Sequence, residues 1–119
     1  MPYNEQLAQR LRAKLASEEG LSEKNMFGGL GFLLNGNMCC GVIKDNMVAR
    51  IGPKQYQDAL KIRHARIMDF TGKPLKGFVY VEPPGIEDEN DLDAWLERCR
   101  SFVTELPPKQ PGSQEPADP

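Results

Sequence analysis

The sequence predicts an α+β domain in which one antiparallel-rich sheet carries helices mainly on one face. Two observations lead to this fold class. Both ends of the chain show apolar residues at the 3.6-residue period of a helix, and the middle shows alternating apolar segments separated by turn residues. The expected order is α-β(3)-α-β(2)-α. The 119 residues are the size of one ordinary domain, which we place at residues 1–106.

Three helices are expected. Over residues 4–17 leucines recur at every fourth position, and Asn4 is a suitable N-cap. A short helix should begin at Pro53, because proline suits the first helical position. The last helix is the clearest, and either Asp88 or Asn90 can cap it. Its apolar positions are Leu92, Trp95, Leu96, Cys99, Phe102, Val103 and Leu106.

The strands lie between these helices. Residues 24–34 are interpreted as one strand bent by glycines, since glycine inside a strand marks a bulge, a bend or a close backbone approach. Asn35-Gly36 predicts a type I′ hairpin turn. Residues 107–119 are rich in proline and lack an apolar anchor, so they are predicted to be disordered. Further strands are expected at residues 37–44, 47–51, 66–70 and 76–82.

Three segments are unusual in composition. They are Met-Phe-Gly-Gly-Leu-Gly-Phe at 26–32, Met-Val-Ala-Arg-Ile-Gly-Pro at 47–53 and Met-Asp-Phe-Thr-Gly-Lys-Pro-Leu-Lys-Gly-Phe-Val-Tyr-Val at 68–81. In this order and spacing, followed by the Trp95 helix, they resemble the TfoX N-terminal domain family over about residues 5–106. The residues of this structural motif are Met26, Phe27, Gly28, Gly29, Gly31, Gly52, Pro53, Asp69, Gly72 and Gly77.

The resemblance implies a fold similar to the secretion-chaperone-like α-β(3)-α-β(2)-α arrangement, in agreement with the order predicted from the residues. The family includes bacterial regulators of natural competence, which carry a second, C-terminal domain. In this sequence the proline-rich residues 107–119 follow the predicted domain. The resemblance supplies no catalytic residues and implies no cofactor.

Charge is unevenly distributed along the chain, although the net charge is only −2. Residues 50–76 hold seven basic and two acidic residues, a net charge of +5, whereas residues 82–93 hold six acidic residues and no basic one. Arg50, Lys73 and Lys76 are therefore candidates for a site that binds an anion or an acidic partner. The alternative is a solvated polar face of the sheet.

Other residues offer little chemistry. Residues 28–31 lack the glycine spacing of a dinucleotide-binding loop. Cys39 and Cys40 are adjacent in a predicted strand, so we expect them to point to opposite faces and not to share a metal. They are interpreted as buried thiols, with a reactive surface thiol as the alternative. His64 is expected in a solvated loop, and the Asp69 carboxylate is expected to tie down the following turn.

These observations favour a non-enzymatic regulatory or protein-interaction module. It would bind a partner protein, or a second copy of itself, through an exposed sheet edge or face. A nucleic-acid-associated regulator is one alternative, although the net charge argues against it. A small enzyme with a cysteine nucleophile is another. The three cysteines, the lack of a long apolar run and the absence of a signal-peptide pattern predict a cytoplasmic protein without a membrane segment.

Overall fold

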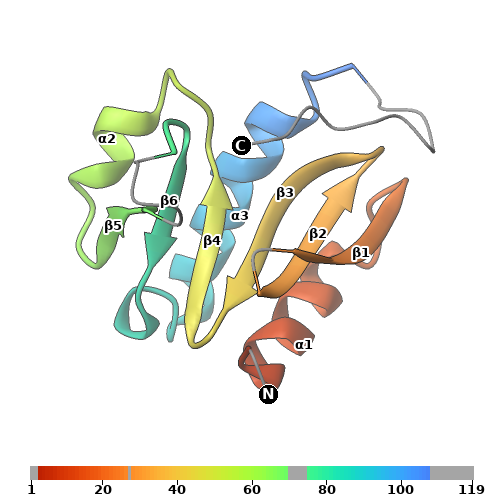
Figure 1. Cartoon of the computed structure of the whole chain (residues 1–119), viewed down its shortest axis with the longest axis horizontal. Helices are drawn as coiled ribbons and strands as arrows, with labels where there is room; N and C mark the ends of the chain where they lie inside the picture. The colour runs from red at the N-terminus through yellow and green to blue at the C-terminus, as the bar shows by residue number, and fades with distance from the viewer. Residues whose placement is uncertain (1–2, 27, 70–74, 108–119) are drawn as a thin grey trace.

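In the part of the chain that the structure describes, six strands form one antiparallel sheet in the order β1-β2-β3-β4-β6-β5. The computed structural model describes residues 3–26, 28–69 and 75–107 (Figure 1). The elements are α1 (Glu5–Leu15), β1 (Leu21–Met26), β2 (Gly29–Leu34), β3 (Asn37–Ile43), β4 (Asn46–Arg50), α2 (Tyr56–Leu60), β5 (Ala65–Ile67), β6 (Phe78–Val81), the 3-10 helix η1 (Pro83–Gly85) and α3 (Glu89–Val103).

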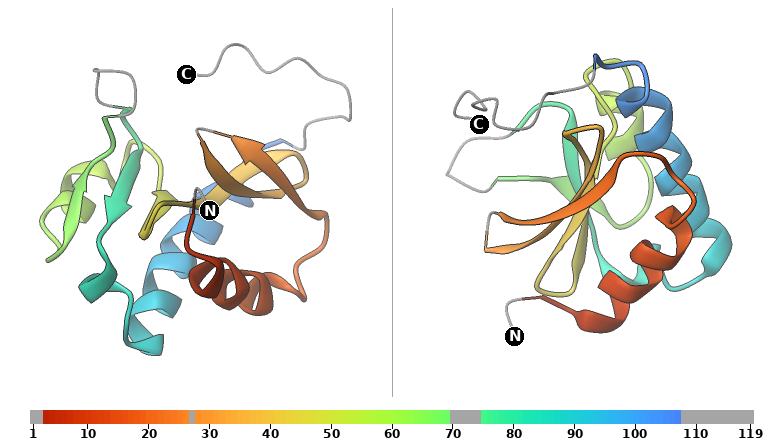
Figure 2. Two further views of the ribbon diagram at one scale, coloured as in Figure 1. Left: turned by 60° about the horizontal axis from the view of Figure 1, so that its bottom comes forward. Right: turned by 90° about the vertical axis from the view of Figure 1, so that its right-hand side faces the viewer.

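The two long helices cover the same face of the sheet. Figure 2 shows α1 and α3 together on one side of the strands. Helix α3 packs against β3 and β4, and α1 packs against β3. The core lies between these helices and the sheet, where Leu11, Phe32, Met47 and Leu96 are fully buried. The predicted α+β class, with an antiparallel sheet and helices on one face, is confirmed.

Capping residues fix where the two long helices begin. The Asn4 side-chain oxygen accepts the backbone N–H of Leu7 at 3.0 Å, as the sequence predicts for an N-cap. Asp88 caps α3 by accepting the N–H of Asn90 at 2.8 Å, which decides between the two capping residues proposed above. The short helix α2 starts at Tyr56, three residues after Pro53, because a turn occupies the intervening positions.

One predicted strand is two strands in the structure. Residues 24–34 do not form a single bent strand, because β1 ends at Met26, β2 begins at Gly29 and the two pair antiparallel as a hairpin. Gly28 has a φ of +75°, a left-handed conformation in which glycine lacks the Cβ clash of other residues. Four strands therefore precede α2 in place of three. The hairpin predicted at Asn35-Gly36 is confirmed, with positive φ at both residues.

Two parts of the structural motif meet although they lie far apart in the sequence. The backbone N–H groups of Ile51 and Gly52 both donate to the Gly77 carbonyl, at 2.9 and 3.1 Å. A Cβ on Gly52 would collide with the Phe102 ring of α3, so a glycine is required where the end of β4 passes this helix. Phe27, Gly72 and Lys73, together with the tail from residue 108, lie outside the described residues.

The glycines of β2 give a first test of the fold. A Cβ on Gly29 would overlap the backbone carbonyl of Val42, whereas a Cβ on Gly31 would meet only the flexible Met26 side chain. We therefore expect Gly29→Ala to lower the free energy of unfolding by about 1–3 kcal/mol, the usual cost of overpacking. Gly31→Ala should cost less than about 1 kcal/mol. Urea unfolding followed by circular dichroism measures both, and equal losses would contradict the hairpin register.

Candidate functional site

The first candidate for a functional site is the face of the sheet that points away from α1 and α3. We call it the open face. Partners opposite one another in adjacent strands share a face, and a continuous row of such partners crosses the sheet. Gly31 pairs with Gly41, Gly41 with Val48, and Val48 with Tyr80. Since Phe32, Ala49 and Val79 belong to the core beneath the helices, this alternate row lies on the open face.

Gly31 of β2 pairs with Gly41 of β3. Because neither has a side chain, the surface of the open face is low between these two strands, and we call this part the glycine floor. A Cβ on Gly31 would lie 2.7 Å from the Met26 sulfur, and one on Gly41 would lie 3.3 Å from the terminal methyl of Met38. Both methionines are half-buried and lie over the glycines. Methionine is unbranched and adapts to irregular surfaces, so this part of the face can change shape on contact.

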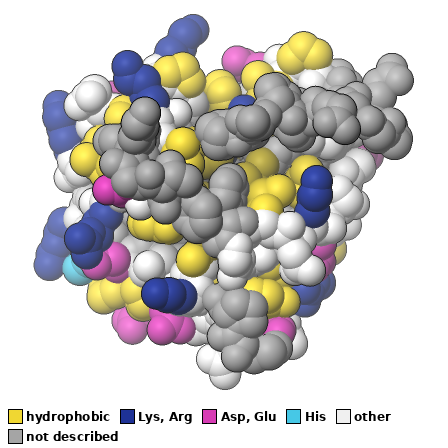
Figure 3. Space-filling model, viewed as in Figure 1, with side chains coloured by type: hydrophobic (Ala, Val, Ile, Leu, Met, Phe, Trp, Pro, Cys, Tyr) yellow, Lys and Arg dark blue, Asp and Glu magenta, His cyan; other side chains and the backbone are white. Residues whose placement is uncertain are grey.

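Further apolar side chains extend the surface. Leu33, which pairs with Met38, and Tyr80 are both half-buried. Figure 3 views the open face and shows hydrophobic side chains over its central strands. Burial raises the pKa of Tyr80, and the nearby charge of Asp69 acts in the same direction. The predicted contact of the Asp69 carboxylate with its turn falls outside the described residues.

Basic residues occur at the margins of the open face. Lys24 of β1 pairs with Gly31, and Arg66 of β5 pairs with Tyr80, so both register positions lie on this face. Arg66 also forms an ion pair with Glu82 at 3.0 Å. Lys76, one of the predicted interaction residues, is exposed. Acidic groups lie here as well, since Arg66 is paired with Glu82 and Asp69 lies near Tyr80, so Lys24 is the exposed basic residue that the register places on this face without an ion pair among the described residues.

Arg50 differs from the solvated basic residue that the sequence suggests. Its guanidinium carbon lies 5.4 Å from the ring centres of both Phe78 and Phe102. Nη1 donates to the Met38 carbonyl at 3.3 Å. Arg50 thus ties the end of β4 to β3, β6 and α3, and its charge lies between two aromatic rings. Its role with Lys73 and Lys76 in binding a partner stays a prediction.

The free edge at β1 is poorly suited to pairing with a second copy. Four of its six residues are exposed. In an antiparallel pair, residues that lie opposite each other point to the same face of the sheet. When two copies of β1 pair symmetrically, one residue must therefore lie opposite the same residue of the other copy. Near the middle of β1 that residue is Glu23 or Lys24, and like charges directly opposite are destabilising. The charged edge favours the open face over the edge as a docking surface.

A β-bulge brings the adjacent cysteines together. The register of β2 and β3 shifts so that Phe32 pairs with Cys40 and Leu33 with Met38, which leaves Cys39 as the extra residue. Cys39 and Cys40 are both fully buried in the core, and their thiols are hydrogen-bonded. The prediction that they point to opposite faces is wrong, because the alternation of side chains fails at a bulge. Neither is a surface thiol.

Cys99 of α3 completes this thiol cluster, defined as Cys39, Cys40 and Cys99. All three are free and buried. Hydrogen bonds from Cys40 and Cys99 lower the pKa of Cys39, and the charges of Arg100 and Arg50 lower it further. The bond to Cys39 raises the pKa of Cys40, and burial raises that of Cys99. Arg100 Nη1 is buried without a hydrogen-bond partner in the described part of the chain.

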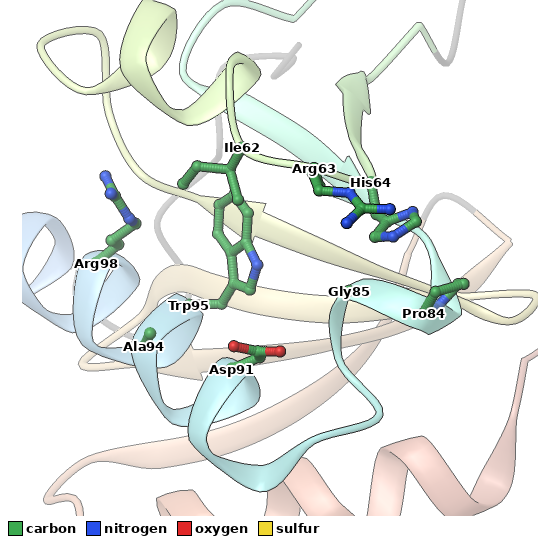
Figure 4. A pocket seen from close by; sticks show the side chains of 9 residues that line it. All are labelled: Ile62, Arg63, His64, Pro84, Gly85, Asp91, Ala94, Trp95 and Arg98. Atoms are coloured by element: carbon green, nitrogen blue, oxygen red, sulfur yellow. The ribbon is translucent and has the colours of Figure 1, made fainter.

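A pocket lies beside α3, and no pattern in the sequence predicts it. It lies between the loop at residues 62–64, the η1 turn and α3, where the largely buried Trp95 forms its apolar wall (Figure 4). His64, expected to be a solvated loop residue, is half-buried and lines this pocket. The lining comes from three separate segments, and only the tertiary fold joins them.

Within residues 3–26, 28–69 and 75–107, no group of three or more His, Cys, Asp or Glu side chains could hold a metal ion. None of the helices in these ranges is long and apolar enough to cross a membrane.

The architecture defines a small α+β domain whose antiparallel sheet is covered by helices on one face. Residues 13–103 match the family described as the TfoX N-terminal domain, so the chain belongs to this family, as the sequence motifs predict. Neither the curated proteins nor the solved structures contain a match. The likeness to secretion chaperones that the resemblance implies stays a prediction.

The electrostatics of the thiol cluster can be measured. Arg100→Gln should raise the pKa of Cys39, because it removes a cation that favours the thiolate. Arg98→Gln, two residues earlier in α3, is the control and should leave this pKa unchanged. Ultraviolet thiolate absorbance across a pH titration reports the ionisation. If the native protein shows no thiolate below the range of free cysteine, about pH 8.5, the account of the cluster is wrong.

The lowered pKa of Cys39 also predicts the direction in which the stability of the fold changes with pH. The pKa of Cys39 is lower in the folded chain than in the unfolded one, so its ionisation stabilises the fold in full above about pH 8.5. This contribution is lost as the pH falls through the folded pKa. Urea unfolding of the native chain and of Cys39→Ser should therefore diverge as the pH rises towards about 8.5. A constant difference across this range would contradict the lowered pKa.

Proposed function

We propose that this TfoX N-terminal domain is a non-enzymatic regulatory module that binds a partner protein through its open face. The observation that carries the proposal is the glycine floor at Gly31 and Gly41, over which the half-buried Met26 and Met38 lie. A low floor lets a partner approach the backbone closely, and methionine side chains can repack around it. Such adaptable methionine-rich surfaces are characteristic of protein-binding sites.

The chemistry of the face describes the partner. Leu33, Met38 and Tyr80 contribute half-buried apolar side chains, and Lys24 contributes an exposed positive charge at the β1 margin. The matching partner presents apolar side chains flanked by carboxylates, because unlike charges at the rim of an interface speed association. A heterologous partner suits this face better than a second copy, which would bring the same exposed Lys24 to the contact and no matching carboxylate of its own for it.

Two further expectations accompany the proposal. The role is assigned without a cofactor, since binding through an apolar face requires none. The cell compartment is the cytoplasm, because the three thiols of the cluster are free, as in a reducing environment.

Charge insertion tests the face directly. Met38→Glu or Leu33→Glu should abolish partner binding, since each buries a carboxylate in an apolar contact. Ile67→Glu is the matched control. Ile67 is 48% exposed and pairs with Val79, so its register position lies on the opposite face. The tagged chain and the three variants are used to recover proteins from lysate, with thermal unfolding as the check on folding.

The proposal requires a protein recovered by the native chain and by Ile67→Glu that both open-face variants lose. Recovery that all three variants share would assign the interaction to another surface. A native chain that recovers no specific protein, and remains monomeric by light scattering, would remove the proposal. Lys24→Ala with Lys76→Ala should slow association by about tenfold at low salt, with a smaller effect at high salt.

A further inference from the structure

The pocket beside α3 has the size and composition of a small-molecule site. Its volume is about 480 Å³, within the range of ordinary ligand pockets. Trp95, Ile62, Ala94 and Pro84 give it apolar walls, and a few charged side chains converge on it. None of these groups takes part in the open face, so the inference that follows is independent of the proposed function.

Backbone constraints hold the loop that forms one wall. His64 has a φ of +71°, a left-handed conformation that is uncommon for residues other than glycine. Its carbonyl accepts the backbone N–H of Glu82 at 2.9 Å. A Cβ on Gly85 would lie 3.0 Å from the His64 Cβ, so glycine permits the close approach of the η1 turn to this loop. The unfavourable conformation of His64 is kept where its side chain lines the pocket.

The opposite wall is equally fixed. Trp95 is only 3% exposed, and its ring lies beside Ile62 in Figure 4. The Arg98 guanidinium carbon is 5.9 Å from the centre of the indole, and Arg98 Nη1 donates to Gln55 Oε1 at 2.8 Å. These contacts come from α3 and from the residues that flank α2 on either side. The indole is therefore held in one orientation before a ligand arrives.

Two opposite charges face the pocket from different elements. Figure 4 shows Arg63 and His64 together on one side, with the Asp91 carboxylate directed into the space from α3. Arg63 and Asp91 form no ion pair with each other, nor with any other side chain of the described residues at 4.0 Å or less. The cavity thus places two exposed side chains of opposite charge, Arg63 and Asp91, on different walls, while the other lining cation, Arg98, is hydrogen-bonded to Gln55.

We propose that this pocket binds a small zwitterion of the α-amino-acid type with an apolar side chain. The ligand carboxylate pairs with Arg63 beside His64, the ammonium group pairs with Asp91, and the side chain covers Trp95 and Ile62. A ligand with both charges satisfies both walls through charge-assisted hydrogen bonds. An anion without the ammonium group faces repulsion from Asp91, and a cation without the carboxylate faces repulsion from Arg63.

The fluorescence of Trp95 reports binding, because it is the only tryptophan of the chain. Three probes are titrated: L-leucine, N-acetyl-L-leucine, which lacks the ammonium group, and L-leucinamide, which lacks the carboxylate. We expect a saturable change with L-leucine at a concentration about tenfold lower than with either derivative, since each derivative loses one charged hydrogen bond. Isothermal titration calorimetry gives a second measure of the same affinities.

Two variants should change how strongly the pocket prefers L-leucine over the two derivatives. Asp91→Asn should weaken L-leucine by about tenfold and strengthen N-acetyl-L-leucine. Arg63→Gln should weaken L-leucine similarly and strengthen L-leucinamide. Arg66→Gln, which removes an exposed arginine outside the pocket, is the control and should change none of the affinities. Both pocket side chains are exposed, so thermal unfolding should show that all variants fold.

Several results would overturn the inference. They are the absence of a saturable signal with L-leucine by both fluorescence and calorimetry, equal affinity for all three probes, and variants that bind L-leucine as the native chain does. Retained L-leucine binding in Met38→Glu would leave the pocket intact whatever becomes of the open face.

Discussion

The packing of α3 across β3 and β4 is the interaction on which the other features depend. Trp95, Leu96, Cys99 and Val103 bury one side of this helix in the core. The same packing delivers Cys99 to the thiols of β3 and sets Phe102 against Gly52. It also turns the outer side of the helix, with Asp91, towards the pocket. One amphipathic helix thereby contributes to the core, to the thiol cluster and to the pocket.

Ion pairs hold α1 against the start of α3. Lys14 contacts Glu89 at 3.0 Å and Asp93 at 2.8 Å, and Arg10 contacts Glu89 at 3.1 Å. Glu89 and Asp93 belong to the acidic segment at residues 82–93. The carboxylates of these pairs are exposed and the cations only partly buried, so each pair is weak and the pairs orient two helices that the apolar core already holds. Because both helices cover one face, α1 and α3 do not cover the other face, where the methionines and glycines of β1–β3 lie.

The sequence predicts those elements whose signals are local. The leucine period of α1, the Asn35-Gly36 turn and the long apolar stripe of α3 each depend on a few neighbouring residues, and the structure confirms them. The Gly28 turn was missed because a glycine within an apolar segment indicates a bend as readily as a reversal. Which of the two occurs depends on whether Leu21–Met26 finds a partner in β2, a contact between strands that composition does not reveal.

The candidate sites were harder to predict than the fold. The bulge at Cys39 depends on the register of two strands, and it reverses the orientation inferred from simple alternation. The pocket joins residues near positions 63, 85 and 95 that no spacing rule connects. The charge pattern singles out Arg50, but its position between the rings of Phe78 and Phe102 depends on where the fold places α3.

The central claim, that the open face is the docking surface, is most directly tested by methionine oxidation footprinting. The chain carries natural probes, because Met26 and Met38 are half-buried on the open face whereas Met47 is fully buried in the core. The oxidation rate of each methionine is measured by mass spectrometry in the isolated chain and in the complex recovered from lysate. Slower oxidation of Met38 and Met26 in the complex, with Met47 unchanged, is the predicted result. Unchanged rates at Met38 and Met26 would contradict the account.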